Sequence, residues 1–194
     1  MKDICFSIEK FTYTDLNTEL DLSFLPKLVK RRLNKLDRNT VFLLNELYDT
    51  EIENIIFSSK FGEFERLDSL INQYLEYSEV SPNTFSSSVH NFPVGFFAIF
   101  KKTTIPTSAL SASNDSFSIG FLNAILSKEN KILYCYSEED RGIALKINKE
   151  KREYKLIKKE TSEKDNDYDI RFLNFIQKKL PEIEFPFYKI ERII

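Results

Sequence analysis

The sequence of 194 residues has little of the chemistry that metal and redox sites require. It contains one histidine and two cysteines, Cys5 and Cys135, and the cysteines form neither a CxxC pair nor a metal-ligand spacing. We therefore expect no zinc, no haem and no other metal site. Both cysteines lie within apolar, strand-like runs, ICFSI and ILYCY, which predicts buried free thiols.

Other signals are missing as well. No stretch approaches the ~20 consecutive apolar residues of a membrane-spanning helix, and MKDICFSIEKF has no apolar run of signal-peptide length, so we expect a cytoplasmic protein without a membrane partner. The phosphate-binding motifs GxGxxG and GxxxxGK[ST] do not occur, and we expect no cofactor. With 28 basic and 30 acidic residues the chain is nearly neutral, which gives no argument for a nucleic-acid partner.

Aromatic side chains are what the sequence has in excess. It contains 18 Phe and 9 Tyr but only 4 Gly. Such rings are buried either inside the protein or against another protein, and an obligate interface would account for part of the excess. The length suits one domain with a sizeable core, so we expect a single domain over residues 1–194.

Hydrophobic periodicity predicts an α/β fold. Expected strands are residues 2–13, 54–58, 106–110 and 131–136, and expected helices are residues 25–47, 63–77, 92–101 and 115–126. Ser81-Pro82 predicts a brief additional helical turn. The helix over 63–77 is amphipathic, and its predicted inner side chains are Phe64, Leu67, Leu70, Ile71 and Tyr74.

Beyond Arg141 the pattern changes. Residues 143–147 and 154–157 alternate and predict a two-stranded hairpin. The charged, glycine-free segment 158–169 predicts a mobile loop. A short helix over 170–180 and a final edge strand within 184–194 complete the chain.

The stretch from residue 81 to residue 126 organises the remainder of the sequence. Its short strand is followed by the turn Ser113-Asn114-Asp115-Ser116 and then by a second apolar helix. Many α/β enzymes place a nucleophile on such a strand-to-helix elbow, because the turn exposes one side chain at a helix N-terminus. The apex here is Asn114, and an amide cannot attack an acyl group.

At these residues the sequence resembles a known family. The spacing of Ser81-Pro82, Asn91, Gly95, Pro106 and the turn at Ala112-Ser113-Asn114-Asp115-Ser116 is similar to the N-terminal half of β-ketoacyl-acyl carrier protein synthases. The string SVHN resembles the short ketosynthase-like proteins of aryl polyene and flexirubin pathways. The resemblance covers roughly residues 25–140.

The resemblance implies half of a thiolase-like fold over residues 1–140, with a C-terminal extension over 141–194. It also implies that Asn114 occupies the position of the acyl-accepting cysteine. Chain-length factors, the inactive partners of type II ketosynthases, commonly replace that cysteine with glutamine. The implied function is therefore a non-catalytic, chain-length-factor-like subunit that pairs with a full-length ketosynthase.

The resemblance also implies where partners bind. In ketosynthases the strand before the elbow pairs with its twin across the dimer two-fold axis, so the implied interface residues are Pro106, Thr107, Ser108, Ala109 and Leu110. The predicted helix over 25–47 carries a basic cluster of Lys27, Lys30, Arg31, Arg32 and Lys35. This cluster is either a solvated helix face or a docking site for an acyl carrier protein, which is acidic.

Three residues before the elbow are expected to be structural. The resemblance implies that the catalytic histidines of a ketosynthase come from a C-terminal half, so we expect His90 to make a structural hydrogen bond beside Asn91. Gly95 should allow close packing of its helix against a neighbouring backbone.

Two further hypotheses remain open. A small acyl hydrolase or transferase would use Ser113 or Ser116 with His90, although the sequence lacks GxSxG. A ketosynthase-like scaffold or homodimer would carry no acyl chemistry at all.

Overall fold

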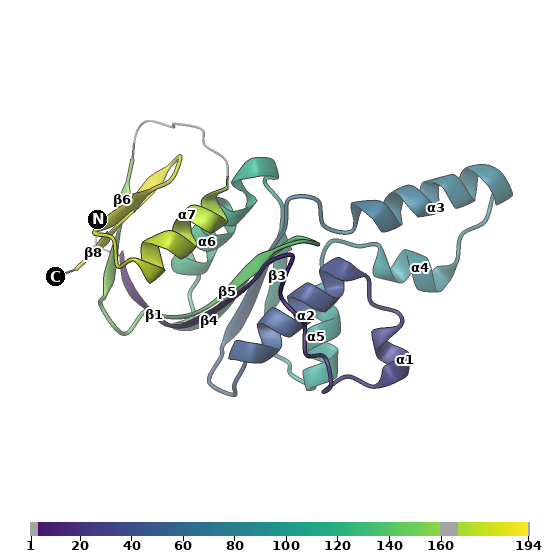
Figure 1. The fold of residues 1–194 in the computed structure, drawn as a ribbon, viewed down its shortest axis with the longest axis horizontal. Coiled ribbons are helices and arrows are strands. Elements are labelled where there is room, and N and C mark those ends of the chain that lie inside the picture. Colours follow the sequence, from purple (N-terminus) through teal and green to yellow (C-terminus); the bar gives the residue numbers. More distant parts are fainter. Residues whose placement is uncertain (1–3, 160–166, 194) are drawn as a thin grey trace.

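The computed structural model describes residues 4–159 and 167–193. Its eight strands form one mixed sheet in the order β3-β2-β4-β5-β1-β6-β8-β7 (Figure 1). The strands are β1 (Ile4–Thr14), β2 (Asn54–Ser58), β3 (Thr107–Leu110), β4 (Lys131–Ser137), β5 (Gly142–Asn148), β6 (Tyr154–Lys158), β7 (Glu182–Glu184) and β8 (Tyr188–Arg192). β2 pairs in parallel with β3 and β4, and the other pairings are antiparallel.

Helices cover both faces of this sheet. They are α1 (Lys27–Lys30), α2 (Lys35–Leu47), α3 (Phe64–Tyr77), α4 (Pro82–Ser87), α5 (Phe92–Lys101), α6 (Ser116–Leu126) and α7 (Tyr168–Gln177). α2 and α5 share one apolar core with the sheet, while α6 and α7 share the other. Alternate strand residues supply the two cores: Ile56 and Tyr134 belong to the α6 side, and Phe57 and Cys135 to the α2 side.

Several local predictions are confirmed. The strands over 54–58 and 131–136 and the helices over 92–101 and 115–126 have nearly the expected bounds. Ser81 caps the short helix α4 by accepting a hydrogen bond from the Thr84 N–H. Both cysteines are free, and burial raises the pKa of the Cys135 thiol, whereas Cys5 is only half-buried.

Among the described residues no helix is long and apolar enough to cross a bilayer.

The single helix predicted over residues 25–47 is wrong. The chain forms the four-residue helix α1, breaks, and begins α2 at Lys35. Asn34 makes a capping box with Asp37: the Asn34 side chain accepts from the Asp37 N–H, and the Asp37 carboxylate accepts from the Asn34 N–H. The basic cluster therefore spans two helices and the connection between them, not one helix face.

The predicted C-terminal hairpin is also wrong. β5 and β6 do not pair with each other, because β1 lies between them. Residues 4–6 of β1 pair with β6, and residues 7–14 pair with β5, with a register shift between Ile8 and Lys10 inside the pairing with β5. The N-terminal strand thus joins the C-terminal strands to the remainder of the sheet.

The last segment forms two strands where one edge strand is predicted. β8 lies inside the sheet between β6 and β7, and β7 is the edge. The helix predicted over 170–180 is α7, which begins at Tyr168. Of the predicted mobile loop, residues 160–166 lie outside the described residues, while Lys158 ends β6 and Asp169 lies in α7.

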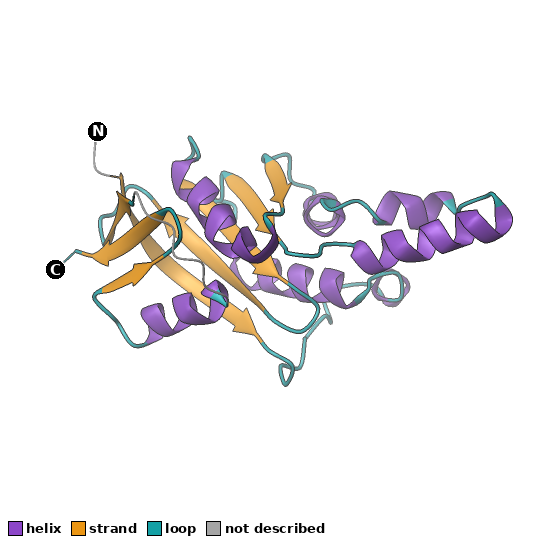
Figure 2. Cartoon of the chain, turned by 90° about the horizontal axis from the view of Figure 1, so that it is seen from above, coloured by secondary structure: helices purple, strands orange, loops and turns teal. Residues whose placement is uncertain are grey.

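The helices α3 and α4 project from the body of the protein (Figures 1 and 2). We refer to residues 61–89 as the α3–α4 arm. The predicted inner face of α3 is not buried: Leu70 is buried, but Phe64, Leu67, Ile71 and Tyr74 are exposed. The periodicity predicted the helix correctly, but nothing in the described part of the chain covers its apolar face.

Candidate functional site

The elbow lies at the carboxyl end of the parallel strands. β3 ends at Leu110, and the chain turns through Ser113, which has a positive φ of 54°, before α6 starts at Ser116. The Ser116 hydroxyl closes this turn by donating to the Ser113 carbonyl (2.7 Å) and accepting from the Ala112 N–H (2.9 Å). The strand-to-helix elbow is therefore present, and its buried serine hydroxyl is engaged by the backbone.

Asn114 is exposed on this turn and lines a cavity of about 330 Å³. The other lining residues come from four separate parts of the chain, and they are Lys60, Phe117, Tyr136, Arg141, Asp167, Tyr168 and Asp169. An amide can donate and accept hydrogen bonds in such a cavity. It supplies no nucleophile for acyl transfer.

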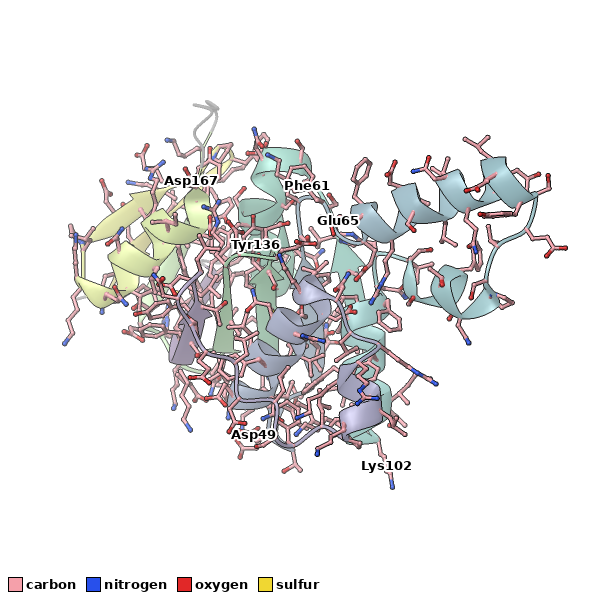
Figure 3. All side chains as sticks on the ribbon, turned by 45° about the vertical axis from the view of Figure 1, so that its right-hand side comes forward. Asp49, Phe61, Glu65, Lys102, Tyr136 and Asp167 are labelled. Atoms are coloured by element: carbon pink, nitrogen blue, oxygen red, sulfur yellow. The ribbon has the colours of Figure 1, made fainter. Side chains whose placement is uncertain are left out.

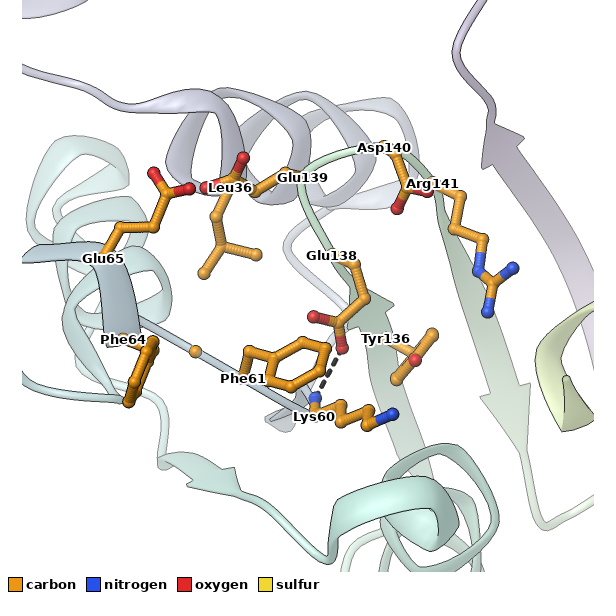
Figure 4. Close-up of a pocket in the computed structure, with 11 residues that line it drawn as sticks. Leu36, Lys60, Phe61, Phe64, Glu65, Tyr136, Glu138, Glu139, Asp140 and Arg141 are labelled. Carbon is orange, nitrogen blue, oxygen red and sulfur yellow. Dashed lines mark hydrogen bonds between the residues drawn. The ribbon is translucent and has the colours of Figure 1, made fainter. Parts of the chain in front are cut away.

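A second cavity of about 430 Å³ adjoins the first and shares Lys60, Tyr136 and Arg141 with it (Figure 4). Glu138 lies at its centre, where its carboxylate accepts hydrogen bonds from the Lys60 N–H (2.5 Å) and the Ser59 hydroxyl (3.2 Å). Burial raises the pKa of Glu138 above its ordinary value, against these hydrogen bonds. Glu138 thus links the end of β2 to the end of β4.

The C-terminal extension contributes to the same end of the sheet. Arg141 forms ion pairs with Asp167 (2.8 Å) and Asp169 (3.1 Å) at the start of α7. Figure 3 shows Phe61, Tyr136 and Asp167 around this end, with Asp49 at the opposite end. Burial raises the pKa of Asp169, although Arg141 opposes this shift.

His90 makes the structural contact that we predict. Its Nε2 atom lies 3.0 Å from the Leu110 carbonyl oxygen at the end of β3. A carbonyl only accepts, so Nε2 carries the proton. A Cβ atom at Gly62, where φ is +55°, would lie only 2.1 Å from His90 Nδ1, so only glycine fits there. Among the described residues no hydrogen bond joins His90 to Ser113 or Ser116.

The other two predicted structural residues behave differently. The Asn91 carbonyl accepts from the Gly95 N–H (2.9 Å) in the first turn of α5. The expected close packing at Gly95 is wrong, because an added Cβ would meet nothing within 4 Å. α5 buries Val94 and Phe97 instead, which leaves the Gly95 side of the helix open.

The predicted interface strand lies at the edge of the sheet. β3 pairs only with β2, through bonds from the Ile55 N–H to Pro106 O (3.0 Å) and from the Ser59 N–H to Leu110 O (3.3 Å). In a parallel pair of strands, every second residue directs its N–H and C=O groups toward the neighbouring strand. Because Pro106 and Leu110 face β2, Ser108 also faces β2. The N–H and C=O groups of Thr107 and Ala109 consequently point to the open edge.

Residues 9–141 match the family of β-ketoacyl synthase N-terminal domains. The chain belongs to this family. The match confirms the resemblance seen in the sequence, and a search of curated proteins finds no match.

Solved ketosynthase structures share the fold. A chain of the complex between ketosynthase ApeO and its chain length factor ApeC from Xenorhabdus doucetiae has a TM-score of 0.80 at 20% identity, over 97% of this chain and 99% of that one. The ishigamide ketosynthase/chain length factor gives 0.57 at 11% identity, over 73% of this chain and 52% of that one. A β-ketoacyl synthase from Burkholderia phymatum gives 0.50 at 10% identity, over 73% of this chain and 50% of that one. The fold is therefore the thiolase-like ketosynthase fold.

For this ketosynthase-like domain, sequence reasoning missed the charged residues around the elbow. Lys60, Glu138 and Arg141 meet only because β2 and β4 are adjacent parallel strands. The sequence did contain a signal for these residues. Polar residues directly follow two apolar strands, as Ser59-Lys60 after one and as the run SEED at residues 137–140 after the other. In residues 4–159 and 167–193, no group of three or more His, Cys, Asp or Glu side chains is placed to hold a metal ion.

Two acidic side chains lie near the basic cluster, since Asp21 interacts electrostatically with Lys30 and Glu139 with Lys35. None of Lys27, Lys30, Arg31, Arg32 and Lys35 forms an ion pair within the described part of the chain. Lys30, Arg31 and Arg38 surround a shallow depression beside Asp21. The cluster is thus a local positive surface on a nearly neutral protein.

Proposed function

We propose that this chain is a non-catalytic, chain-length-factor-like subunit that pairs with an active β-ketoacyl synthase in polyene or fatty acid-type biosynthesis. The observation that carries the proposal is Asn114, which lies on the elbow where the family resemblance implies the acyl-accepting cysteine. The ketosynthase fold is retained, but the elbow offers an amide and the nearby Ser116 hydroxyl is bonded to the backbone.

Two further observations support pairing. The edge of β3 is open, and unpaired strand edges lead to association or aggregation unless they are covered. The ApeO structure is a complex of a ketosynthase with its chain length factor, and this chain has nearly the same length as the matching chain. A ketosynthase on the β3 edge would cover the open backbone groups and extend the sheet across the two subunits.

The proposal is tested by purifying the tagged chain from its own host and identifying what co-purifies. We expect a full-length ketosynthase, with condensing activity in the complex and none in the isolated chain. Asn114→Cys should not give the isolated chain this activity, because a thiol at the elbow has no histidine beside it: His90 is bonded to Leu110. Acyl transfer by the isolated wild-type chain that is lost in Ser113→Ala or His90→Ala would support the hydrolase instead, and a stable homodimer with no ketosynthase bound would support the scaffold.

The basic cluster is proposed to dock the acyl carrier protein, because carrier proteins are acidic. Reversing the charge of Lys27, Arg31 and Lys35 to glutamate should slow association with the carrier protein at least about tenfold and reduce its salt dependence. Stability should change little, since these side chains form no ion pair among the described residues. Stopped-flow association at several salt concentrations measures the effect.

A matched control reverses three exposed lysines elsewhere, Lys102, Lys128 and Lys178. It changes the net charge equally but leaves the cluster intact, so association should stay close to the wild-type rate. Equal slowing by both triple variants would mean that only net charge matters and that the cluster is a solvated surface.

A further inference from the structure

The α3–α4 arm carries an unusual share of the exposed apolar surface. Of the 19 large apolar side chains that are exposed in the described residues, ten lie between residues 61 and 89. These are Phe61, Phe64, Leu67, Ile71, Tyr74, Leu75, Tyr77, Val80, Phe85 and Val89. Exposed apolar side chains that gather on one part of a protein mark an interaction site where they form a contiguous patch.

Five of these side chains form one continuous stripe along α3. Phe64, Leu67, Ile71, Tyr74 and Leu75 recur at helical spacing, and their exposed fractions range from 46% to 75%. Leu70 is the one buried side chain of this helix. The stripe is thus an amphipathic face of the type that seats against another apolar surface.

The charged side chains that α3 exposes all have one sign, and Asp68 flanks the stripe. Glu65, Asp68 and Glu76 are exposed, while the only cation of α3, Arg66, points inward to Asp37 (2.5 Å) and Glu63 (3.0 Å). Two copies of such a surface would repel each other, and so would an anionic membrane or an acidic carrier protein. The complementary occupant is an apolar protein surface bordered by lysine or arginine.

The arm is held firmly and close to the β3 edge. Arg66 donates to the carbonyls of Ser87 (2.9 Å) and Arg32 (3.0 Å), which ties α3 to α4 and to the body. His90, directly after the arm, bonds the Leu110 carbonyl at the end of β3. A subunit seated on the β3 edge would therefore approach the base of the arm, at the end of β3 that His90 contacts.

We propose that the α3 stripe is a second docking surface for the ketosynthase subunit, which contributes an apolar surface with a basic border. This proposal rests on the proposed function, because it takes the same partner. The β3 edge supplies backbone hydrogen bonds to that partner, and the stripe supplies apolar burial and charge complementarity.

The test compares two triple variants in binding to the ketosynthase that co-purifies with the wild-type chain. Leu67→Ser, Ile71→Ser and Tyr74→Ser together should weaken binding at least tenfold, mainly through faster dissociation. The control, Leu16→Ser with Ile170→Ser and Leu180→Ser, removes exposed apolar side chains away from the arm and should bind as the wild type does. Circular dichroism and urea unfolding establish that both variants remain folded, as expected for exposed positions.

A charge variant gives an independent measurement that leaves the stripe in place. Asp68→Lys with Glu76→Lys should also weaken ketosynthase binding, and more strongly at low salt than at high salt. Unchanged ketosynthase binding in the stripe variant and in the charge variant would overturn this proposal while the proposed function stands. If the wild-type chain binds no ketosynthase, this proposal and the proposed function both fail. Loss of self-association in the stripe variant would instead assign the stripe to a second copy, and loss of flotation with phosphatidylcholine–phosphatidylglycerol vesicles would assign it to a membrane.

Discussion

Replacing Thr107 with proline should abolish the complex with the ketosynthase while leaving this chain folded. The Thr107 N–H points to the open edge of β3 and has no partner strand among the described residues, so its loss costs the isolated protein little. In the complex, the proline removes one backbone donor, and its ring obstructs the approaching strand. We expect the dissociation constant to rise at least about a hundredfold, measured by calorimetry or sedimentation.

Two neighbouring variants make this test specific. Thr107→Val keeps the N–H and should bind as the wild type does. Ser108→Pro removes a group that faces β2, so it should destabilise the isolated chain as well as weaken the complex. Wild-type affinity in Thr107→Pro would show that the ketosynthase does not pair with β3, even if it binds elsewhere.

Replacing Arg66 with methionine should destabilise the chain by about 3–5 kcal/mol, because it leaves two buried carboxyl groups without the cation that both contact. Asp37 is fully buried and Glu63 is 3% exposed, and both contact the Arg66 guanidinium. Urea unfolding measures the loss. Arg38→Met is the control, since Arg38 is exposed and its guanidinium donates to the Lys30 carbonyl without forming an ion pair among the described residues. A loss below about 1 kcal/mol, the scale of surface ion pairs, would contradict the prediction.

The pH dependence of this loss has a definite sign. Burial raises the pKa of Asp37, and burial together with the Asp37 charge raises the pKa of Glu63 to about 8. A carboxyl whose folded pKa lies above its unfolded value binds its proton more tightly when folded, so stability falls as pH rises between those two values. Removing Arg66 raises both folded pKa values further. The Arg66→Met loss should therefore be larger at about pH 8 than at about pH 5, and adding Glu63→Gln should reduce that difference.

The sequence alone determined the local elements and the elbow. The apolar run at residues 54–58, the helical turn that begins at Ser81-Pro82 and the turn at Ser113 each depend on neighbouring residues, and the structure has all three. The family resemblance, now confirmed over residues 9–141, also came from local spacing. The Asn34–Asp37 capping box was equally local, but the continuous apolar period over 25–47 concealed it.

Long-range contacts decided the rest. β1 separates β5 from β6, and Lys60 meets Glu138 because β2 and β4 lie side by side. Helical periodicity showed that α3 has an apolar face and that Gly95 lies on α5. It could not show that the apolar face of α3 and the Gly95 side of α5 face outward. Periodicity and turn chemistry fix backbone dihedrals over a few residues, whereas strand order and burial depend on which distant segments meet. That is why the sequence determined the elements and the elbow, and only the tertiary structure determined which charges surround Asn114 and which surfaces remain open to a partner.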